Sequence, residues 1–194
     1  MNDKEVWRKF KNGNEAAFAQ IYSRYVKMLF GYGMKLVKDT DIVEDCIHDL
    51  FIELWGRKEH LGDTDAVKLY LFKALKRKII RVVARHRTSL QSTTSITDEF
   101  DADIVFPHET LLILNQLNYE QEERLKQGIN KLSENQREII YLRFYANLSY
   151  EEISSLLLIN YQSVKNLMFR SMKALRKELI STFISFHLLL FLIA

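Results

Sequence analysis

The amino-acid sequence predicts an all-α fold with two small helical domains joined by a flexible acidic linker. One proline and six glycines among 194 residues leave few helix breakers, which favours long helices over a turn-rich β fold. Hydrophobic residues make up 47% of the chain, which is enough for packed cores. Apolar residues recur at helical spacing, and two basic segments flank an acidic stretch that is rich in Ser and Thr.

The first domain is predicted over residues 6–87 as a helical bundle. Apolar residues at helical spacing predict its first helix over residues 15–37. Asp39 can cap a second helix, whose apolar residues form one broad stripe that includes Cys46. A third helix is expected over residues 66–86, with apolar residues inside and a basic run outside. That run comprises Lys73, Lys76, Arg77, Lys78, Arg81, Arg85 and Arg87.

The linker is predicted over residues 88–110, which contain no Lys or Arg and lack helical periodicity. The second domain is expected over residues 111–180 as a four-helix unit. It contains two capping boxes, Ser133 with Gln136 and Ser149 with Glu152. A hydrophobic tail over residues 181–194 has an apolar run shorter than the ~20 residues of a membrane span. We expect it to pack on the second domain or on a partner, with membrane anchoring as the alternative.

Residues 148–179 have the layout of a DNA-binding helix-turn-helix: a short helix, a tight break and a longer basic helix that Asn160 can cap. The break lacks the usual glycine, so Leu158 must adopt a costly backbone angle or the turn must differ. The alternative is an ordinary helical hairpin with a solvated basic face. The expected buried stripe is Val164, Leu167, Met168, Met172 and Leu175. The candidate DNA contacts to base edges and phosphates are Tyr161, Gln162, Ser163, Lys165, Asn166, Phe169, Arg170 and Lys173.

Charge patterns on two helices of the first domain indicate further surfaces. Asp41, Asp45, Asp49 and Glu53 recur every four residues, and like charges at that spacing cost about 0.2–0.5 kcal/mol per pair. This row suggests a basic partner surface, and the alternative is a solvated acidic face. The basic run on the next helix suggests contacts with a nucleic-acid backbone or a single strand. Its alternative is a solvated amphipathic helix.

Several classes of function are not supported by the sequence. It contains no nucleophile–base pair, no Gly-rich phosphate loop and no metal-ligand cluster, so we predict no enzyme activity, no cofactor and no metal site. His48 beside Asp45 and Asp49 lacks a complete ligand set. The single cysteine, Cys46, is expected in the core, excludes an intramolecular disulfide and fits a reducing, cytoplasmic setting. The first residues do not have the pattern of a signal peptide.

In order and spacing, the segments over residues 6–178 resemble those of a bacterial extracytoplasmic-function sigma factor. In the first domain the resemblance rests on FKNGNEAAFAQIYSRYV, DIVEDCIHDLFIELW and YLFKALKRKIIRVVARHR. In the second it rests on LSENQREIIYLRFYANLSYEEIS and NYQSVKNLMFRSMKALRK. Two departures are that Arg77 and Arg81 stand where many relatives carry Asn and Asp, and Leu167 stands where many carry Arg.

The resemblance implies a promoter-specificity subunit that joins core RNA polymerase and is commonly held inactive by an anti-sigma factor, often a membrane-bound one. It implies that the recognition helix reads the −35 element of promoter DNA. It implies that residues 63–87 open and hold the −10 element, with candidates Lys73, Lys76, Arg77, Lys78, Arg81 and Arg85. It implies polymerase contacts by Asp45, Asp49, Leu50, Phe51 and Trp55. The main alternative is a free-standing helix-turn-helix regulator that binds a palindromic operator as a dimer.

Overall fold

The computed structural model describes residues 2–90 and 119–193, with side-chain surroundings for residues 2–85 and 125–179. Every regular element within these ranges is helical, so the predicted all-α class is confirmed. The chain divides into two compact units, one ending at residue 102 and the other beginning at residue 103. Apart from residues 88–90, which continue a helix, the predicted linker lies outside the described residues, as does the predicted start of the second domain at residue 111.

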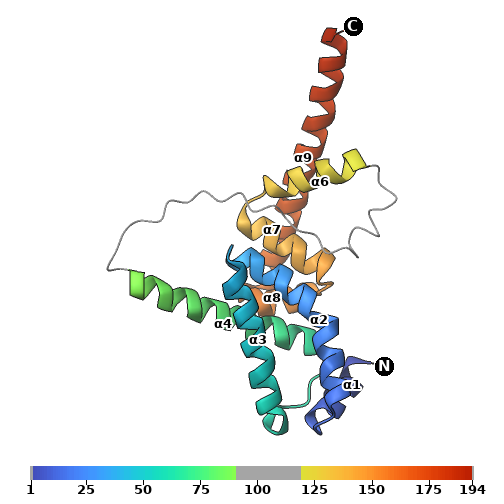
Figure 1. The fold of residues 1–194 in the computed structure, drawn as a ribbon. Helices are drawn as coiled ribbons and strands as arrows, with labels where there is room; N and C mark the ends of the chain where they lie inside the picture. The colour runs from blue at the N-terminus through green and yellow to red at the C-terminus, as the bar shows by residue number, and fades with distance from the viewer. Residues whose placement is uncertain (1, 91–118, 194) are drawn as a thin grey trace. The chain divides into compact units, whose positions relative to one another are not determined.

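The first unit is a helical bundle. It contains α1 (Asp3–Lys11), α2 (Glu15–Leu36), α3 (Thr40–Gly56), a short 3-10 turn η1 (Lys58–His60) and α4 (Val67–Leu90). The helices α2, α3 and α4 pack pairwise against one another, and α1 packs mainly on α2 (Figure 1). Helix α4 corresponds to the predicted third helix and extends four residues beyond its predicted end at residue 86.

Helix α1 is an element that the periodicity did not predict. Its N-cap is Asn2, whose side chain accepts a hydrogen bond from the Lys4 amide at 3.4 Å. Val6, Trp7 and Phe10 are almost completely buried, so tertiary packing accounts for a helix too short to be stable alone. The Trp7 indole N–H also donates to the Gly62 carbonyl at 3.1 Å, which ties α1 to the loop before α4.

Close packing of α2 on α3 depends on one glycine. A Cβ placed on Gly33 would lie 2.6 Å from Cγ1 of Val43, which is shorter than any ordinary carbon–carbon contact. Helix α3 begins as predicted, because the Asp39 carboxylate accepts a hydrogen bond from the Ile42 amide at 3.1 Å. The bundle core that results is lined by fully buried large side chains: Tyr25, Leu29, Tyr32, Leu71, Phe72, Leu75 and Ile79.

The second unit contains α6 (Tyr119–Asn130), α7 (Glu134–Ile140), a π-helical turn η2 (Tyr141–Tyr145), α8 (Tyr150–Leu157) and α9 (Tyr161–Ile193). Helices α6, α7 and α8 each pack on α9. Ser133 begins α7 as predicted, since its amide donates to the Gln136 side chain at 3.1 Å. Asn147 follows η2 with a positive φ of 48°, a backbone angle that commonly ends a helix. The core of the unit includes Ile139, Leu142, Leu148, Ile153 and Val164.

Helix α9 is one continuous helix of 33 residues. Figure 1 shows it passing α6 and projecting beyond it toward the C-terminus. The recognition helix and the predicted tail up to Ile193 therefore belong to the same element, and no break separates them. Within the described parts of the chain, none of the helices combines the length and the hydropathy that crossing a membrane requires.

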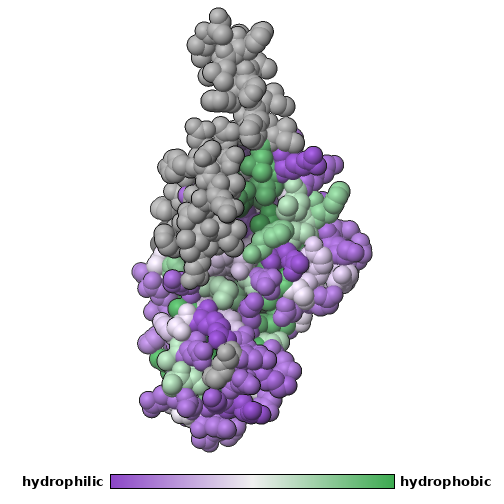
Figure 2. All heavy atoms as spheres, turned by 90° about the vertical axis from the view of Figure 1, so that its right-hand side faces the viewer, coloured by the Kyte–Doolittle hydropathy of each residue, from purple (hydrophilic) through white to green (hydrophobic). Residues whose placement is uncertain are grey.

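Hydrophilic residues form most of the coloured surface on the face drawn in Figure 2, and apolar residues form narrower bands between them. This distribution is expected of helices whose apolar stripe faces a core. The exposed large apolar side chains are few, and three of them lie on α9. In the described ranges they are Tyr22, Ile52, Ile80, Phe144, Leu158, Tyr161, Phe169 and Met172.

Candidate nucleic-acid interface

The turn between α8 and α9 has the geometry of a helix-turn-helix, although it contains no glycine. The predicted capping box begins α8: the Ser149 amide donates to Glu152 at 2.8 Å, and the Glu152 amide donates to the Ser149 hydroxyl at 3.2 Å. Leu158 then adopts φ 58° and ψ 36° in the left-handed region, which is the costly backbone angle that was one of the two alternatives expected for this turn. Its side chain is 90% exposed, so packing does not compensate this conformation.

Ser154 stabilises the turn from the preceding helix. Its hydroxyl donates to the Ile159 carbonyl at 2.6 Å. Its own carbonyl accepts hydrogen bonds from the amides of Leu158 and Ile159. The polar groups that the left-handed residue would otherwise leave unpaired are therefore satisfied.

Asn160 starts the recognition helix by accepting a hydrogen bond from the Ser163 amide at 2.7 Å, as predicted. The Gln162 amide nitrogen donates to Oδ1 of Asn166 at 3.1 Å, so two amide side chains lie together on the exposed face. Phe169 is 70% exposed. We call the exposed residues on this side of α9 the recognition surface: Tyr161, Gln162, Lys165, Asn166, Phe169, Arg170 and Lys173.

Aromatic contacts hold the start of the recognition helix against α8. The rings of Tyr150 and Tyr161 meet edge to face with centroids 6.2 Å apart. Lys165 Nζ lies 5.6 Å from the Tyr161 ring, and the Arg143 guanidinium lies 5.2 Å from the Tyr150 ring. Arg143 also donates to the Leu148 carbonyl at 2.9 Å. These contacts hold two cations close to the exposed amides of the recognition surface. Such an arrangement suits DNA, in which phosphates lie next to the base edges.

The buried side of α9 differs from its prediction at two positions. Val164, Met168 and Leu175 are buried as expected, but Met172 is 42% exposed and Leu167 is only half-buried. Ser171, which was not predicted in the stripe, is buried instead, and its hydroxyl donates to the Leu167 carbonyl at 2.8 Å. Ser163 is half-buried, so it is less available for base contacts than the rest of the candidate set.

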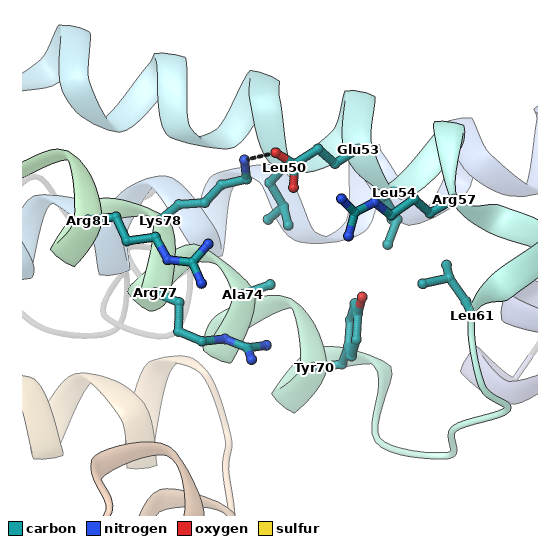
Figure 3. Close-up of a pocket in the computed structure, with 10 residues that line it drawn as sticks. All are labelled: Leu50, Glu53, Leu54, Arg57, Leu61, Tyr70, Ala74, Arg77, Lys78 and Arg81. Carbon is teal, nitrogen blue, oxygen red and sulfur yellow. Dashed lines mark hydrogen bonds and ion pairs between the residues drawn. The ribbon is translucent and has the colours of Figure 1, made fainter.

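The first unit has a basic pocket of about 220 Å³ between α3 and α4. Figure 3 shows the guanidinium groups of Arg57, Arg77 and Arg81 directed toward this space, with the Tyr70 phenol ring facing it from the start of α4. Lys78 lies at its edge, where Nζ is 2.6 Å from Oε1 of Glu53. This hydrogen bond holds the pKa of the Glu53 carboxyl below its usual value. The pocket therefore combines an aromatic ring with an excess of cations.

The loop that precedes α4 is tied to α1 by ion pairs. Lys11 Nζ lies 2.5 Å from the Asp63 carboxylate, and Lys4 Nζ lies 2.9 Å from that of Asp65. The hydrogen bond from Lys11 lowers the pKa of Asp63. Tyr70 packs edge-on against Trp7, with ring centroids 5.4 Å apart. Helix α1, which sequence reasoning missed, therefore positions one wall of the basic pocket.

The six predicted basic candidates of α4 are not equivalent. Arg77, Arg81 and Arg85 are exposed, whereas Lys73, Lys76 and Lys78 are half-buried. Arg77 donates from Nε to the Lys73 carbonyl at 3.3 Å. Arg57 was not predicted, because it lies outside the basic run and is brought to the pocket only by the packing of α3 on α4. In the sequence, the only feature that marks Arg57 is that it directly follows the acidic helix α3.

The acidic row of α3 is exposed, but two predicted apolar contact residues are not. Asp41, Asp45 and Asp49 are exposed and form what we call the acidic face. Leu50 and Phe51 are buried in the bundle core, and their predicted contact with a partner stays a prediction. They occupy the middle of the apolar stripe, which faces α2 and α4. The exposed apolar residue of α3 is Ile52 (56% exposed), and its position off the stripe could have identified it.

Trp55 lies half-buried at the edge of an aromatic cluster. Its ring centroid is 5.0 Å from that of Phe18 and 6.3 Å from that of Phe10. Lys58 Nζ lies 4.5 Å from the Trp55 ring, which is a cation–π contact. Part of this predicted contact residue therefore remains available at the C-terminal end of α3.

Metal and thiol chemistry have no evident site in the parts of the chain that the structure describes. No group of three or more His, Cys, Asp or Glu side chains is arranged to hold a metal ion there. His48 is exposed on α3. Cys46 is buried in the core as predicted, and this burial raises the pKa of its thiol.

Family models match both units. The model for sigma-70 region 2 matches residues 21–88, and the model for sigma-70 region 4 matches residues 122–175. Curated relatives include the ECF RNA polymerase sigma factor SigK of Mycobacterium bovis, which is 23% identical over 171 residues that cover 87% of this chain and 89% of SigK. They also include ECF RNA polymerase sigma factor SigM of Bacillus subtilis, which is 24% identical over 157 residues that cover 81% of this chain and 91% of SigM.

Solved structures that share the fold include those of two protein complexes. The sigma factor RpoE from Bartonella quintana, determined with the anti-sigma factor NepR, matches with a TM-score of 0.63 and 21% identity. The match covers 84% of this chain and 96% of RpoE. CnrH, determined with the cytosolic domain of CnrY, matches with a TM-score of 0.58 and 18% identity. That match covers 92% of this chain and 97% of CnrH.

Proposed function

The chain belongs to the sigma-70 family as an extracytoplasmic-function sigma factor, and we propose that three of its surfaces divide the work of promoter recognition. As a member of this family it binds core RNA polymerase and directs promoter recognition and transcription initiation. The observation that carries the residue-level proposal is the presence of two separate DNA-competent surfaces, the recognition surface and the basic pocket, in the units that match region 4 and region 2.

The recognition surface reads duplex DNA at the −35 element. Gln162 and Asn166 offer amide groups to base edges, because they lie side by side at 3.1 Å near the start of α9. Lys165, Arg170 and Lys173 follow on the same exposed side and neutralise phosphates. Phe169 supplies an exposed apolar ring suited to a thymine methyl group. Because Leu167 is half-buried, the base sequence that is read depends on the two amides and on Phe169.

The basic pocket captures the opened strand of the −10 element. Three guanidinium groups converge with the Tyr70 ring in a space of about 220 Å³, which suits an unstacked base and the phosphates beside it. Arg77 and Arg81 give this pocket a cationic lining. Strand capture is therefore expected to depend more on backbone charge than on the polar base contacts typical of many relatives.

The acidic face of α3 binds core polymerase. Asp45 and Asp49 are exposed, whereas Glu53 is engaged by Lys78 at 2.6 Å. Ile52 adds an exposed apolar side chain between the acidic residues, and apolar contacts surrounded by charges are a common composition for an interface. Leu50 and Phe51 anchor α3 in the bundle core, and the half-buried Trp55 lies at the C-terminal end of the proposed binding surface.

An inhibitory protein is a further expected partner. RpoE was solved with the anti-sigma factor NepR, and CnrH with the cytosolic domain of CnrY. A binding protein of this kind would keep the chain from polymerase. The chain itself acts by binding rather than by catalysis, and it works in the cytoplasm, where polymerase and DNA are found.

The division of labour is tested by measuring polymerase binding and strand opening separately. Native gels with core polymerase report the first, and fluorescence of a base analogue placed in the −10 non-template strand reports the second. We expect Arg77→Ala with Arg81→Ala to leave polymerase binding unchanged and to reduce the fluorescence increase. Conversely, Asp49→Lys should reduce polymerase binding. Equal loss of both signals in both variants contradicts the assignment.

A further inference from the structure

The C-terminal part of α9 continues beyond the DNA-binding unit. The region 4 match ends at residue 175, whereas the helix continues to Ile193. The last described apolar contacts of α9 are made by Leu175 and Leu179, which pack with Ile129 and Leu132 of the α6–α7 segment. Past this cluster the helix projects beyond α6 (Figure 1).

The sequence of this extension is unusually apolar. Nine of the eleven residues from 183 to 193 are Phe, Ile or Leu, and no charged residue follows Glu178. The last six residues of the helix, from 188 to 193, are all apolar. Because an α-helix completes a turn every 3.6 residues, this end of α9 has apolar residues on every side.

A helix that is apolar all round is suited to a surrounding apolar medium rather than to a single groove. A protein groove or a helix-pair seam would cover one side and leave the opposite side in water. Residues 183–193 extend roughly 16 Å at 1.5 Å per residue, which is about half the ~30 Å thickness of a bilayer core.

The base of the extension is positively charged. Arg176 and Lys177 are exposed on the two turns that precede it. The single acid there, Glu178, is paired with Lys131, whose Nζ lies 3.1 Å from its carboxylate. Cations directly beside an apolar helix end are placed to meet anionic lipid headgroups when that end enters the bilayer.

We propose that the C-terminal end of α9 inserts into the apolar interior of a membrane that contains anionic phospholipid, with Arg176 and Lys177 at the headgroups. The attachment is reversible, because a short apolar segment combined with a few cations gives moderate affinity. The recognition surface lies toward the N-terminal end of the same helix, so α9 would bind the membrane at one end and present its DNA-reading residues toward the other.

Flotation of the full chain with phospholipid vesicles tests this proposal. The probes are vesicles of phosphatidylcholine alone and vesicles that also contain phosphatidylglycerol. We expect the full chain to float with the anionic vesicles, and to do so less at high salt and with the neutral vesicles. A chain that ends at residue 180 should lose roughly tenfold or more of the bound fraction while keeping its helicity and its DNA binding. Aggregated protein remains at the bottom of the gradient and is counted as unbound.

Matched variants distinguish membrane insertion of the helix end from nonspecific adsorption to vesicles. Leu189→Lys places a charge in the apolar end and should weaken flotation about as much as the truncation. Ser181→Lys places the same charge near the basic residues and should preserve or strengthen it. Arg176→Glu with Lys177→Glu should remove the preference for anionic vesicles. Failure of the full chain to float, equal flotation of the truncated chain, or a tail-dependent dimer that ignores vesicles would each overturn the proposal.

Discussion

Lys78 on α4 and Glu53 on α3 form an ion pair, with Nζ of Lys78 2.6 Å from Oε1 of Glu53. This pair joins the basic run to the end of the acidic row. It neutralises one cation of the pocket edge and one carboxylate of α3, and it leaves Asp41, Asp45 and Asp49 as the acidic face. The two charged surfaces of the first unit are therefore separate surfaces with a shared boundary.

Removal of this pair should have a small effect on stability that depends on pH. The hydrogen bond from Lys78 lowers the pKa of Glu53 in the folded state, so its contribution is present above the unfolded pKa and is lost as pH falls through the folded pKa. Because Glu53 is largely exposed, we expect Glu53→Gln to cost less than about 1 kcal/mol at pH 7. The difference from wild type should shrink as pH falls below the ordinary range of Glu, about 4.3, and vanish once Glu53 is protonated in the folded state as well. Urea unfolding across this pH range measures it, with Glu59→Gln as the control.

Replacement of Leu158 should stabilise the second unit only when the new residue is glycine. Leu158 has φ 58° and is almost fully exposed, so its cost lies in the backbone. Leu158→Gly should add about 1 kcal/mol to the free energy of unfolding, whereas Leu158→Ala should add little because alanine keeps the same strain. Thermal unfolding of both variants tests this, and equal stabilisation by the two would show that the side chain is responsible.

Gly33 should not tolerate a side chain unless its neighbour is reduced. A Cβ at this position would meet Val43 Cγ1 at 2.6 Å, so Gly33→Ala should destabilise the first unit by about 1–3 kcal/mol through overpacking. Val43→Ala in the same chain should recover part of that loss. Denaturant unfolding of the two single variants and the double variant measures the coupling. Purely additive losses would argue against this contact.

Two neighbouring residues of the recognition surface should affect DNA binding in different ways. Asn166→Ala removes an amide that faces base edges, so it should relax the preference at one base pair by about 1–3 kcal/mol. Lys165→Ala removes a phosphate contact, so it should weaken binding to all sequences and lower the salt slope by about 1. Fluorescence anisotropy with promoter fragments and base-pair variants distinguishes these outcomes. Identical profiles for the two variants would contradict their assigned roles.

Charge reversal on the acidic face should affect polymerase and not DNA. Asp49→Lys places a cation where a basic partner surface is proposed, and mismatched charges at an interface can cost several kcal/mol. Binding to core polymerase should fall at least about tenfold, with −35 DNA binding unchanged. Glu5→Lys, on the exposed side of α1, makes the same charge change elsewhere and should have little effect. Loss of polymerase binding in both variants would point to net charge instead of this surface.

The features that could be predicted from the sequence are those encoded by a few neighbouring residues. The caps at Asp39, Ser149 and Asn160 and the order of the long helices follow from local rules. The same rules identified Leu158 as the residue at which the turn has to be strained or different. Helix α1 could not be predicted in this way, because its stability comes from burying Trp7 and Phe10 against distant segments.

The charged residues of the candidate site could be predicted from the sequence, but the burial of individual side chains on α3 and α9 could not. Periodicity located an apolar stripe on α3 and another on α9, yet it did not show which edge of each stripe faces the core. Met172 is therefore exposed although it was expected inside, whereas Leu50 and Phe51, which the family resemblance assigned to an interface, are buried in the middle of the α3 stripe. Arg57 joins the basic pocket only through the packing of α3 on α4.

The most direct test of the central claim is transcription by purified core RNA polymerase from genomic fragments, with and without this protein. We predict that the protein produces discrete transcripts, that Asp49→Lys abolishes them by preventing polymerase binding, and that Arg77→Ala with Arg81→Ala reduces them after binding has occurred. The absence of both polymerase binding and new transcripts with the wild-type chain would contradict the account.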